Sequence, residues 1–172
     1  MHAVYCPACG ARTVPRQMGD DGAVPFCEHC DRPWFDCFHT CVLSVLCNAR
    51  GEIALIRQSY GQQTYYVGVA GYMQPGETAE TAALREIKEE IGVDADEIRY
   101  QFSAWHAPRE QLMLCFCAYV KDAVFVCSQE VREAKWFKPE HALQAVRHGS
   151  IIEQLVQAVS AAQRNDEIRE RS

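Results

Sequence analysis

The chain has 172 residues, of which 48% are hydrophobic and 23% are charged, and its formal net charge is -6. This length allows one ordinary domain and a small module, and the acidic balance argues against a general nucleic-acid binder. No apolar run approaches the ~20 residues of a membrane-spanning helix, and "MHAVYCPACG" lacks the pattern of a signal peptide, so we expect a cytoplasmic protein that does not contact membranes.

Paired cysteines come first along the chain. "CPAC" and "CEHC" place Cys6 with Cys9 and Cys27 with Cys30. Two such pairs at this spacing are typical of a tetrahedral zinc site, in which four thiolates leave no position for a substrate. We therefore predict a structural Zn2+ in a zinc ribbon over residues 1–36, a segment too poor in aliphatic residues to fold around its own core. The alternative is a redox dithiol, for which one pair would suffice.

The other cysteines fit a simpler role. Most lie in or beside strand-like runs, where cysteine usually serves as a small core residue: Cys41, Cys47, Cys115, Cys117 and Cys127. An alternative is a second metal site formed by Cys37, His39 and Cys41, which are close in sequence.

Runs rich in β-branched and aromatic residues follow the cysteine pairs. They predict strands over 41–47, 52–58 and 64–70. Between the first two, "NARG" at 48–51 predicts a tight turn. We therefore expect a hairpin and a third strand before the acidic stretch that comes next.

The stretch "ETAETAALREIKEEIG" predicts one helix. Thr78 suits the N-cap and Gly92 suits a left-handed C-cap. Leu84, Ile87 and Ile91 recur at three- and four-residue spacing and form an apolar stripe. The helix therefore has one face suited to the core and leaves its charged residues on another.

Three glutamates share that other face, because Glu86, Glu89 and Glu90 stand at i, i+3 and i+4. One interpretation is a solvated acidic surface, where each like-charge pair costs a few tenths of a kcal/mol. The other is a site for a hard divalent cation, because close carboxylates repel by about 3 kcal/mol a pair and an oxygen-liganded ion reverses that repulsion. These three residues alone do not distinguish the two interpretations, so the surrounding sequence is needed.

Further regular elements follow the acidic helix. The runs at 112–120 and 133–137 predict strands. Helical periodicity covers 139–149 and 150–165. Strands on both sides of an acidic helix, closed by C-terminal helices, predict an α+β fold.

The segment Gly71 to Val93, "GYMQPGETAETAALREIKEEIGV", resembles the Nudix box. That pattern is Gly, five residues, Glu, seven residues, Arg-Glu, an aliphatic, any residue, Glu-Glu, any residue, Gly and an aliphatic. Every defined position is matched: Gly71, Glu77, Arg85, Glu86, Ile87, Glu89, Glu90, Gly92 and Val93. The resemblance favours the metal interpretation of the acidic face.

The resemblance implies hydrolysis of a nucleoside diphosphate linked to another group, with two or more Mg2+ or Mn2+ ions. It implies that Glu86, Glu89 and Glu90 hold these ions, which would neutralise charge at phosphorus and activate a water. Arg85 and Glu77 would pair with each other or with the ligands and fix their orientation.

A zinc ribbon before a Nudix domain resembles the architecture of NADH pyrophosphatases. In "AGYMQPGET", Tyr72 follows Gly71 and matches an aromatic that stacks on a base, the alternative being a half-buried strand residue. In "EVREAKWF", Glu130 matches a further metal ligand, the alternative being a solvated loop acid. "FSAWHAPREQLM" keeps Trp105 but loses most of the family's diagnostic segment. In "GSIIEQLV", Ile152 stands where the family usually has alanine, which would crowd a bound ring.

The resemblance also implies the whole architecture: a zinc ribbon over 1–36, then a Nudix α/β/α sandwich with a mixed β-sheet over 37–172, assembled as a homodimer. Three functions stay open. The first is cleavage of NADH or a related dinucleotide into two monophosphates. The second is the same chemistry on ADP-ribose, FAD or a nucleotide-capped RNA. The third is a non-enzymatic nucleotide sensor or nucleic-acid adaptor that uses Arg12, Arg16 and Arg32 of the ribbon.

Overall fold

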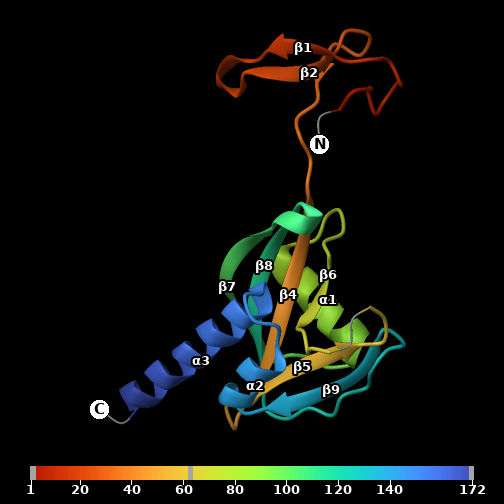
Figure 1. Ribbon diagram of the computed structural model, residues 1–172. Coiled ribbons are helices and arrows are strands. Elements are labelled where there is room, and N and C mark those ends of the chain that lie inside the picture. The colour runs from red at the N-terminus through yellow and green to blue at the C-terminus, as the bar shows by residue number, and fades with distance from the viewer. Residues whose placement is uncertain (1–2, 62–63, 171–172) are drawn as a thin grey trace. The chain divides into compact units, whose positions relative to one another are not determined.

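The computed structural model describes residues 3–61 and 64–170. The chain divides into two compact units, Met1–Phe38 and His39–Ser172. Figure 1 shows both units. This division falls two residues after the boundary expected from the sequence.

The first unit is a small antiparallel sheet. Its strands are β1 (Val14–Gln17), β2 (Ala23–Cys27) and β3 (Arg32–Pro33), and the turn η1 (Gly19–Asp21) joins the first two. Few hydrophobic side chains are buried in it: Cys6, Val24, Phe26 and Cys27. So small a core agrees with the expectation that a metal supplies much of this unit's stability.

The second unit contains a mixed sheet. Its strands are β4 (His39–Asn48), β5 (Ile53–Gln58), β6 (Val69–Tyr72), β7 (Glu97–His106), β8 (Gln111–Val120) and β9 (Val131–Phe137). The order is β7-β8-β4-β5-β9, and β6 pairs with β4 beside it. Only β4 and β8 run parallel among these pairs in the described ranges. The expected mixed sheet is confirmed.

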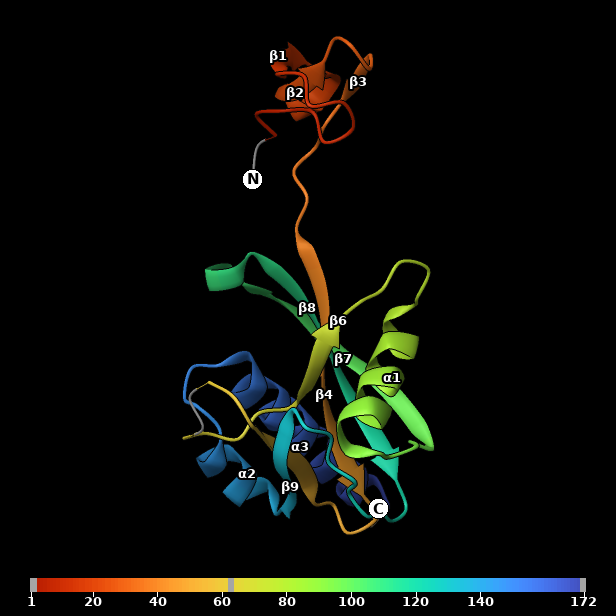
Figure 2. The same ribbon diagram turned by 90° about the vertical axis from the view of Figure 1, so that its right-hand side faces the viewer.

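Helices cover both faces of this sheet: α1 (Ala79–Ile91) on one, α2 (Pro139–Ala145) and α3 (Ile151–Glu170) on the other. Figure 2 shows the three layers edge-on. Side chains alternate along a strand, so in β4 Leu43 and Val45 pack toward α2 and α3 while Val42 and Leu46 pack on the α1 side. The α/β/α sandwich is confirmed. No helix in the described part of the chain is long and apolar enough to cross a membrane.

Two boundaries and one whole strand differ most from the sequence expectation. The third strand begins at Val69 rather than at 64. The helix expected to reach 149 ends at Ala145, because Val146 is extended and bridges Tyr66. Strand β7 was not expected at all: it is an edge strand in which every residue is exposed or half-buried, and its pairing with β8 shifts register between Tyr100 and Phe102.

Candidate active site

Helix α1 is held at both ends as its sequence predicts. The Thr78 hydroxyl accepts a hydrogen bond from the Thr81 N–H at 3.2 Å, and Gly92 adopts the left-handed conformation with φ 70°. Its buried face is made by Ala82, Ala83, Ile87 and Ile91, while Leu84 is only half-buried. The apolar stripe is therefore shifted slightly toward the two alanines, which allow the helix to approach the sheet closely.

The three glutamates of α1 differ in environment although they share a face. Glu90 is 8% exposed and lies deepest. The Glu86 side chain is 14% exposed, and that of Glu89 is 58% exposed. Two carboxylates therefore face the interior of the unit, and the third lies at its surface.

Glu90 carries an unsatisfied buried oxygen. Burial, followed by the charges of Glu86 and Glu130, raises the pKa of Glu90 to about 8. Its Oε2 atom is buried without a hydrogen-bond partner in the described structure. A buried carboxylate with a free oxygen beside two others is the arrangement that a divalent cation stabilises.

Arg85 connects the glutamates to the loop before the helix. Its Nε donates to Glu77 Oε1 at 2.6 Å, and its Nη1 donates to Glu86 Oε1 at 2.7 Å and to Glu89 Oε2 at 2.9 Å. Its Nη2 reaches the Tyr72 carbonyl at 3.1 Å. The Arg85 hydrogen bonds, together with the Gln74 N–H, lower the pKa of Glu77. The side chain thus makes both contacts that the sequence left as alternatives.

The strand that precedes the helix approaches Glu86 closely. A Cβ atom at Gly71 would lie 1.9 Å from the Glu86 carboxylate, so only glycine fits there. The next residue, Tyr72, is 53% exposed. Its hydroxyl accepts a hydrogen bond from Gln111 Nε2 at 2.7 Å, and its ring contacts His39 edge-on with centroids 5.4 Å apart. The aromatic side chain is therefore held beside the glutamates with much of its surface free.

A cavity of about 470 Å³ lies between these elements, and we call it the acidic cavity. Its lining includes the expected residues Gly71, Tyr72, Glu86, Glu90 and Glu130. Glu130 comes from the turn before β9, far from α1 in sequence. The structure does not place Glu77, Arg85 or Glu89 in this lining.

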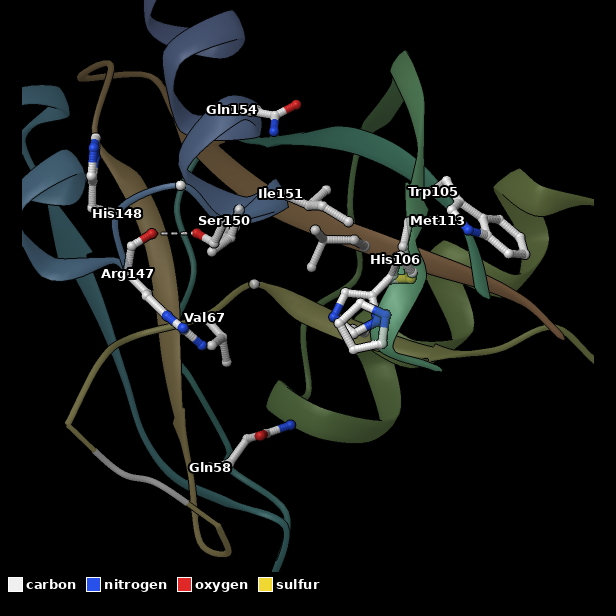
Figure 3. Close-up of a pocket in the computed structure, with 17 residues that line it drawn as sticks. Gln58, Val67, Trp105, His106, Met113, Arg147, His148, Ser150, Ile151 and Gln154 are labelled. Carbon is white, nitrogen blue, oxygen red and sulfur yellow. Dashed lines mark hydrogen bonds between the residues drawn. The ribbon is translucent and has the colours of Figure 1, made fainter. Parts of the chain in front are cut away.

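A second cavity, of about 570 Å³, is lined by Trp105 and Ile152, and we call it the side cavity. Figure 3 shows that Trp105 lies at the end of this cavity opposite to Arg147. Gln58, Ala70 and Met113 line both cavities. The two cavities are therefore adjoining parts of one cleft.

The sequence interpretation missed several residues of this cleft: Gln58, Tyr60, Arg109 and Gln111 in the acidic cavity, and His106 and Arg147 in the side cavity. Arg109 belongs to the short turn η2 (Ala107–Arg109) between β7 and β8. In "HAPRE" no local pattern separates this arginine from an ordinary surface arginine.

The four paired cysteines form a compact cluster. The Cys6 and Cys30 Sγ atoms are 3.9 Å apart, those of Cys9 and Cys27 are 3.6 Å apart, and all four lie within 4.8 Å of one another. With Zn–S bonds of about 2.3 Å, the sulfurs of a tetrahedral zinc site are about 3.8 Å apart. The cluster thus fits a zinc ion.

Within the described ranges, only these cysteines gather three or more ligand atoms so closely. Within the same ranges, the ligand atoms of Cys37, His39 and Cys41 do not form such a close cluster, and neither do the carboxylate oxygens of the glutamates. The acidic residues still fit a divalent ion by their chemistry, because carboxylate oxygens are the ligands that Mg2+ and Mn2+ prefer.

A family profile described as NUDIX domain matches residues 38–158. The chain belongs to this family. The resemblance of the Gly71–Val93 segment to the Nudix box is thereby confirmed. The Nudix fold also appears in the crystal structure of a NUDIX hydrolase from Nitrosomonas europaea, with a TM-score of 0.72, 17% identity, and coverage of 96% of this chain and 93% of that one.

Curated relatives carry more specific names. The chain is 29% identical over 158 residues to the NAD-capped RNA hydrolase NudC of Pseudomonas syringae, with 91% of this chain and 55% of that protein covered. It is 30% identical over 146 residues to the NAD-capped RNA hydrolase ndx-9 of Caenorhabditis elegans, with 82% and 38% covered. The chain thus spans only part of the length of these two relatives.

Proposed function

We propose that this chain is a metal-dependent Nudix hydrolase that cleaves the diphosphate linkage of NADH or a related dinucleotide into two monophosphates. The main observation behind this proposal is a single cleft that has an acidic cavity at one end and a mainly apolar cavity at the other. The acidic cavity has Glu86, Glu90 and Glu130 in its lining, which suits divalent ions and a diphosphate. The side cavity is mainly apolar and suits a nucleoside ring. The names of the curated relatives support an NAD-related substrate.

The glutamates have one shared role in this proposal. Glu86, Glu90 and Glu130 hold Mg2+ or Mn2+ inside the acidic cavity, and Glu89 contributes from the exposed side of α1. A bound divalent ion neutralises charge on the diphosphate and lowers the pKa of a water. Glu90 gains most from the ion, because its own pKa is raised and one of its oxygens has no partner.

Arg85 is a positioning residue. Its guanidinium already binds Glu77, Glu86 and Glu89, so it fixes the rotamers of the ligands and tethers α1 to the loop. Gly71 leaves room for the Glu86 carboxylate. Both residues therefore act through the glutamates rather than on the substrate.

Tyr72 and Trp105 provide aromatic surfaces for the substrate. Both are about half exposed, at 53% and 51%. Stacking of a base on such a ring contributes about 1–3 kcal/mol. Ile152 lines the side cavity, where a bound ring would contact it.

The second candidate substrate is a nucleotide cap on RNA, which the names of the relatives favour. ADP-ribose and FAD stay predictions from the sequence. The sensor or adaptor hypothesis has less support. Residues 3–38 contain three arginines and five acidic residues, so the first unit has no net basic charge to attract nucleic acid.

The cysteine cluster supports a second proposal, a structural Zn2+ in a ribbon over residues 1–36, followed by the Nudix domain over 37–172. The match of the Sγ distances to tetrahedral geometry supports it. A homodimer and a cytoplasmic location stay predictions.

The test is a substrate panel on the purified chain. NADH, NAD+, ADP-ribose, FAD and an NAD-capped RNA are supplied with Mg2+ or Mn2+, and release of monophosphates is measured. We expect NADH or the NAD cap to be cleaved with the highest kcat/KM, and we expect no cleavage when the divalent ion is left out.

Each result has a definite meaning. Cleavage of ADP-ribose or FAD far faster than NADH and the NAD cap would reject the substrate but keep the metal-dependent chemistry. Full cleavage in the absence of divalent ions would reject the proposed mechanism.

A further inference from the structure

The side cavity carries charges of one sign only. Seventeen residues line it, and none of them is aspartate or glutamate. Its basic side chains are Arg147, His106 and His148. The adjoining acidic cavity, by contrast, has Glu86 and Glu90 in its lining. The side cavity therefore attracts anionic groups through its own side chains, whereas the acidic cavity attracts cations and, in the proposed function, takes up the diphosphate through the divalent ions that it holds.

Arg147 is the permanently charged group of the side cavity, and its backbone is fixed. The Ser150 N–H and hydroxyl both donate to the Arg147 carbonyl, at 3.3 and 2.5 Å. Just before it, the Tyr66 N–H donates to Ala145 at 2.9 Å, and Val146 bridges Tyr66. In Figure 3 the Arg147 side chain extends beside Val67. The guanidinium is thus presented from an ordered turn between α2 and α3.

This guanidinium has no ion pair among the residues whose side chains the structure describes, 3–61 and 64–165. Nearby acids on α3 and β9 are engaged elsewhere. Glu153 accepts hydrogen bonds from His148 and from the Gly149 N–H, and Glu133 binds Arg57 and Lys135. Figure 3 shows the His148 side chain turned away from the cavity, which leaves Arg147 as its main positive group.

We propose that Arg147 makes the side cavity select dinucleotides whose group in that cavity carries an anionic carboxylate or phosphate. This inference rests on the proposed function, because it assumes that the diphosphate lies in the acidic cavity. The planar guanidinium binds either anion through two parallel hydrogen bonds. Ile151, Ile152 and Met113 supply apolar contacts for the ring that bears it. A neutral carboxamide forms weaker bonds at the same place.

Two matched substrate pairs test the proposal. Nicotinate adenine dinucleotide and NAD+ differ by a carboxylate in place of a carboxamide on the pyridine ring. NADP+ and NAD+ differ by a phosphate on the adenosine ribose. In at least one pair we expect the anionic member to have a kcat/KM about 5- to 20-fold higher, the range for one exposed charge-assisted contact. The pair that responds identifies which anion is bound.

Variants of the chain assign the preference to one side chain. Arg147→Met keeps the length of the side chain but removes its charge. The ratio of kcat/KM between the anionic and the neutral substrate of a pair should then fall to within about 2-fold of one, because only the charged contact is lost. Arg147→Lys should retain part of the preference. Arg164→Met, an exposed arginine on α3 outside the lining, is the matched control and should keep the wild-type ratio.

Two results would overturn the inference: no preference in either pair for the wild type, or an unchanged preference in Arg147→Met. If none of the dinucleotides is cleaved, the proposed function has failed. The role of Arg147 can then be tested separately, by measuring calorimetrically how tightly the same three dinucleotides bind without added divalent ions. Tighter binding of an anionic ligand that Arg147→Met abolishes would support it. Equal affinities would reject it.

Discussion

The cysteine cluster and the glutamate face of α1 both consist of side chains that bind metals, but their arrangements differ. The four Sγ atoms already lie within 4.8 Å of one another, whereas only Glu86 and Glu90 of the α1 face line the cavity of about 470 Å³, and Glu89 lies outside it and binds Arg85. A closed tetrahedral set suits a structural ion, while carboxylates around a cavity leave room for a substrate. The closed site is thus the one expected to be structural, and the open site is the one expected to be catalytic.

The largest effect should follow from opening the cysteine cluster. Cys30→Ser removes one of four thiolates, and structural zinc sites contribute apparent free energies of about 10–16 kcal/mol to the folding of small units. We expect zinc to fall from one ion per chain to a small residue, and the backbone amides of residues 3–38 to lose protection from hydrogen exchange. Elemental analysis and exchange mass spectrometry measure both.

Cys37→Ser is the matched control, because Cys37 is exposed and lies outside the cluster. This variant should keep its zinc and the protection of its backbone amides from hydrogen exchange. Diphosphate hydrolysis by Cys30→Ser should stay within about 10-fold of wild type, because a closed site does not touch the substrate. A Cys30→Ser protein that retained zinc, or one that lost all catalysis while the second unit stayed folded, would break the distinction between the two sites.

The second effect should come from the open site. Glu90→Gln keeps the shape of the most enclosed carboxylate but removes its charge, so turnover should fall by at least ~100-fold, as for other groups that act on the transition state. Folding should not suffer, because burial already disfavours the charged form of Glu90. Steady-state kinetics and thermal unfolding measure the two properties.

Glu80→Gln provides the comparison on the same helix, because Glu80 is exposed and outside both cavities. Its turnover should stay at the wild-type level. Glu130→Gln should lose activity less than Glu90→Gln, since Glu130 is exposed. Near-normal turnover by Glu90→Gln would mean that the acidic face is only a charged surface.

A smaller effect should appear at the aromatic edge of the acidic cavity. Tyr72→Ala removes a stacking surface worth about 1–3 kcal/mol, so KM should rise roughly 5- to 100-fold with a smaller change in kcat. Tyr72→Phe keeps the ring but loses the hydrogen bond from Gln111, and it should stay near wild type. If both variants keep the wild-type KM for every substrate, Tyr72 is a strand residue with no part in binding.

Local sequence predicted those parts of the molecule that depend on local physics. The caps of α1 at Thr78 and Gly92 follow from hydrogen bonding within one turn, and the cysteine pairs follow from ligand spacing. The alternation in β4 likewise follows from side-chain geometry along one strand. These features could be predicted because every interacting group lies close in the chain.

The rest depends on residues that meet only after folding. Arg109 and Arg147 reach the cleft from two turns on different elements, and no local pattern distinguishes them from ordinary surface arginines. Strand β7 is a different case: residues 97–104, "EIRYQFSA", alternate strictly between polar and apolar side chains, so a local strand signal was present there and was missed. Cavity linings therefore need the tertiary structure even where the family is already evident.

The smallest effect concerns Ile152, where the side cavity meets the core. Ile152 is 6% exposed and belongs to the hydrophobic cluster beneath α3, yet it also lines the cavity. Ile152→Ala should widen the cavity and lower KM for a bulky substrate by about 2- to 5-fold, which corresponds to less than about 1 kcal/mol. It should also destabilise the second unit by about 2–4 kcal/mol, because a buried isoleucine loses its packing.

Val159→Ala separates these two consequences. Val159 is fully buried in the same cluster but does not line the side cavity, so its truncation should lower stability while KM stays unchanged. If Ile152 acts by crowding the substrate, only Ile152→Ala lowers KM, although both variants unfold at lower temperature. An equal change of KM in both would mean that loosened packing, rather than the space in front of Ile152, controls how the substrate binds.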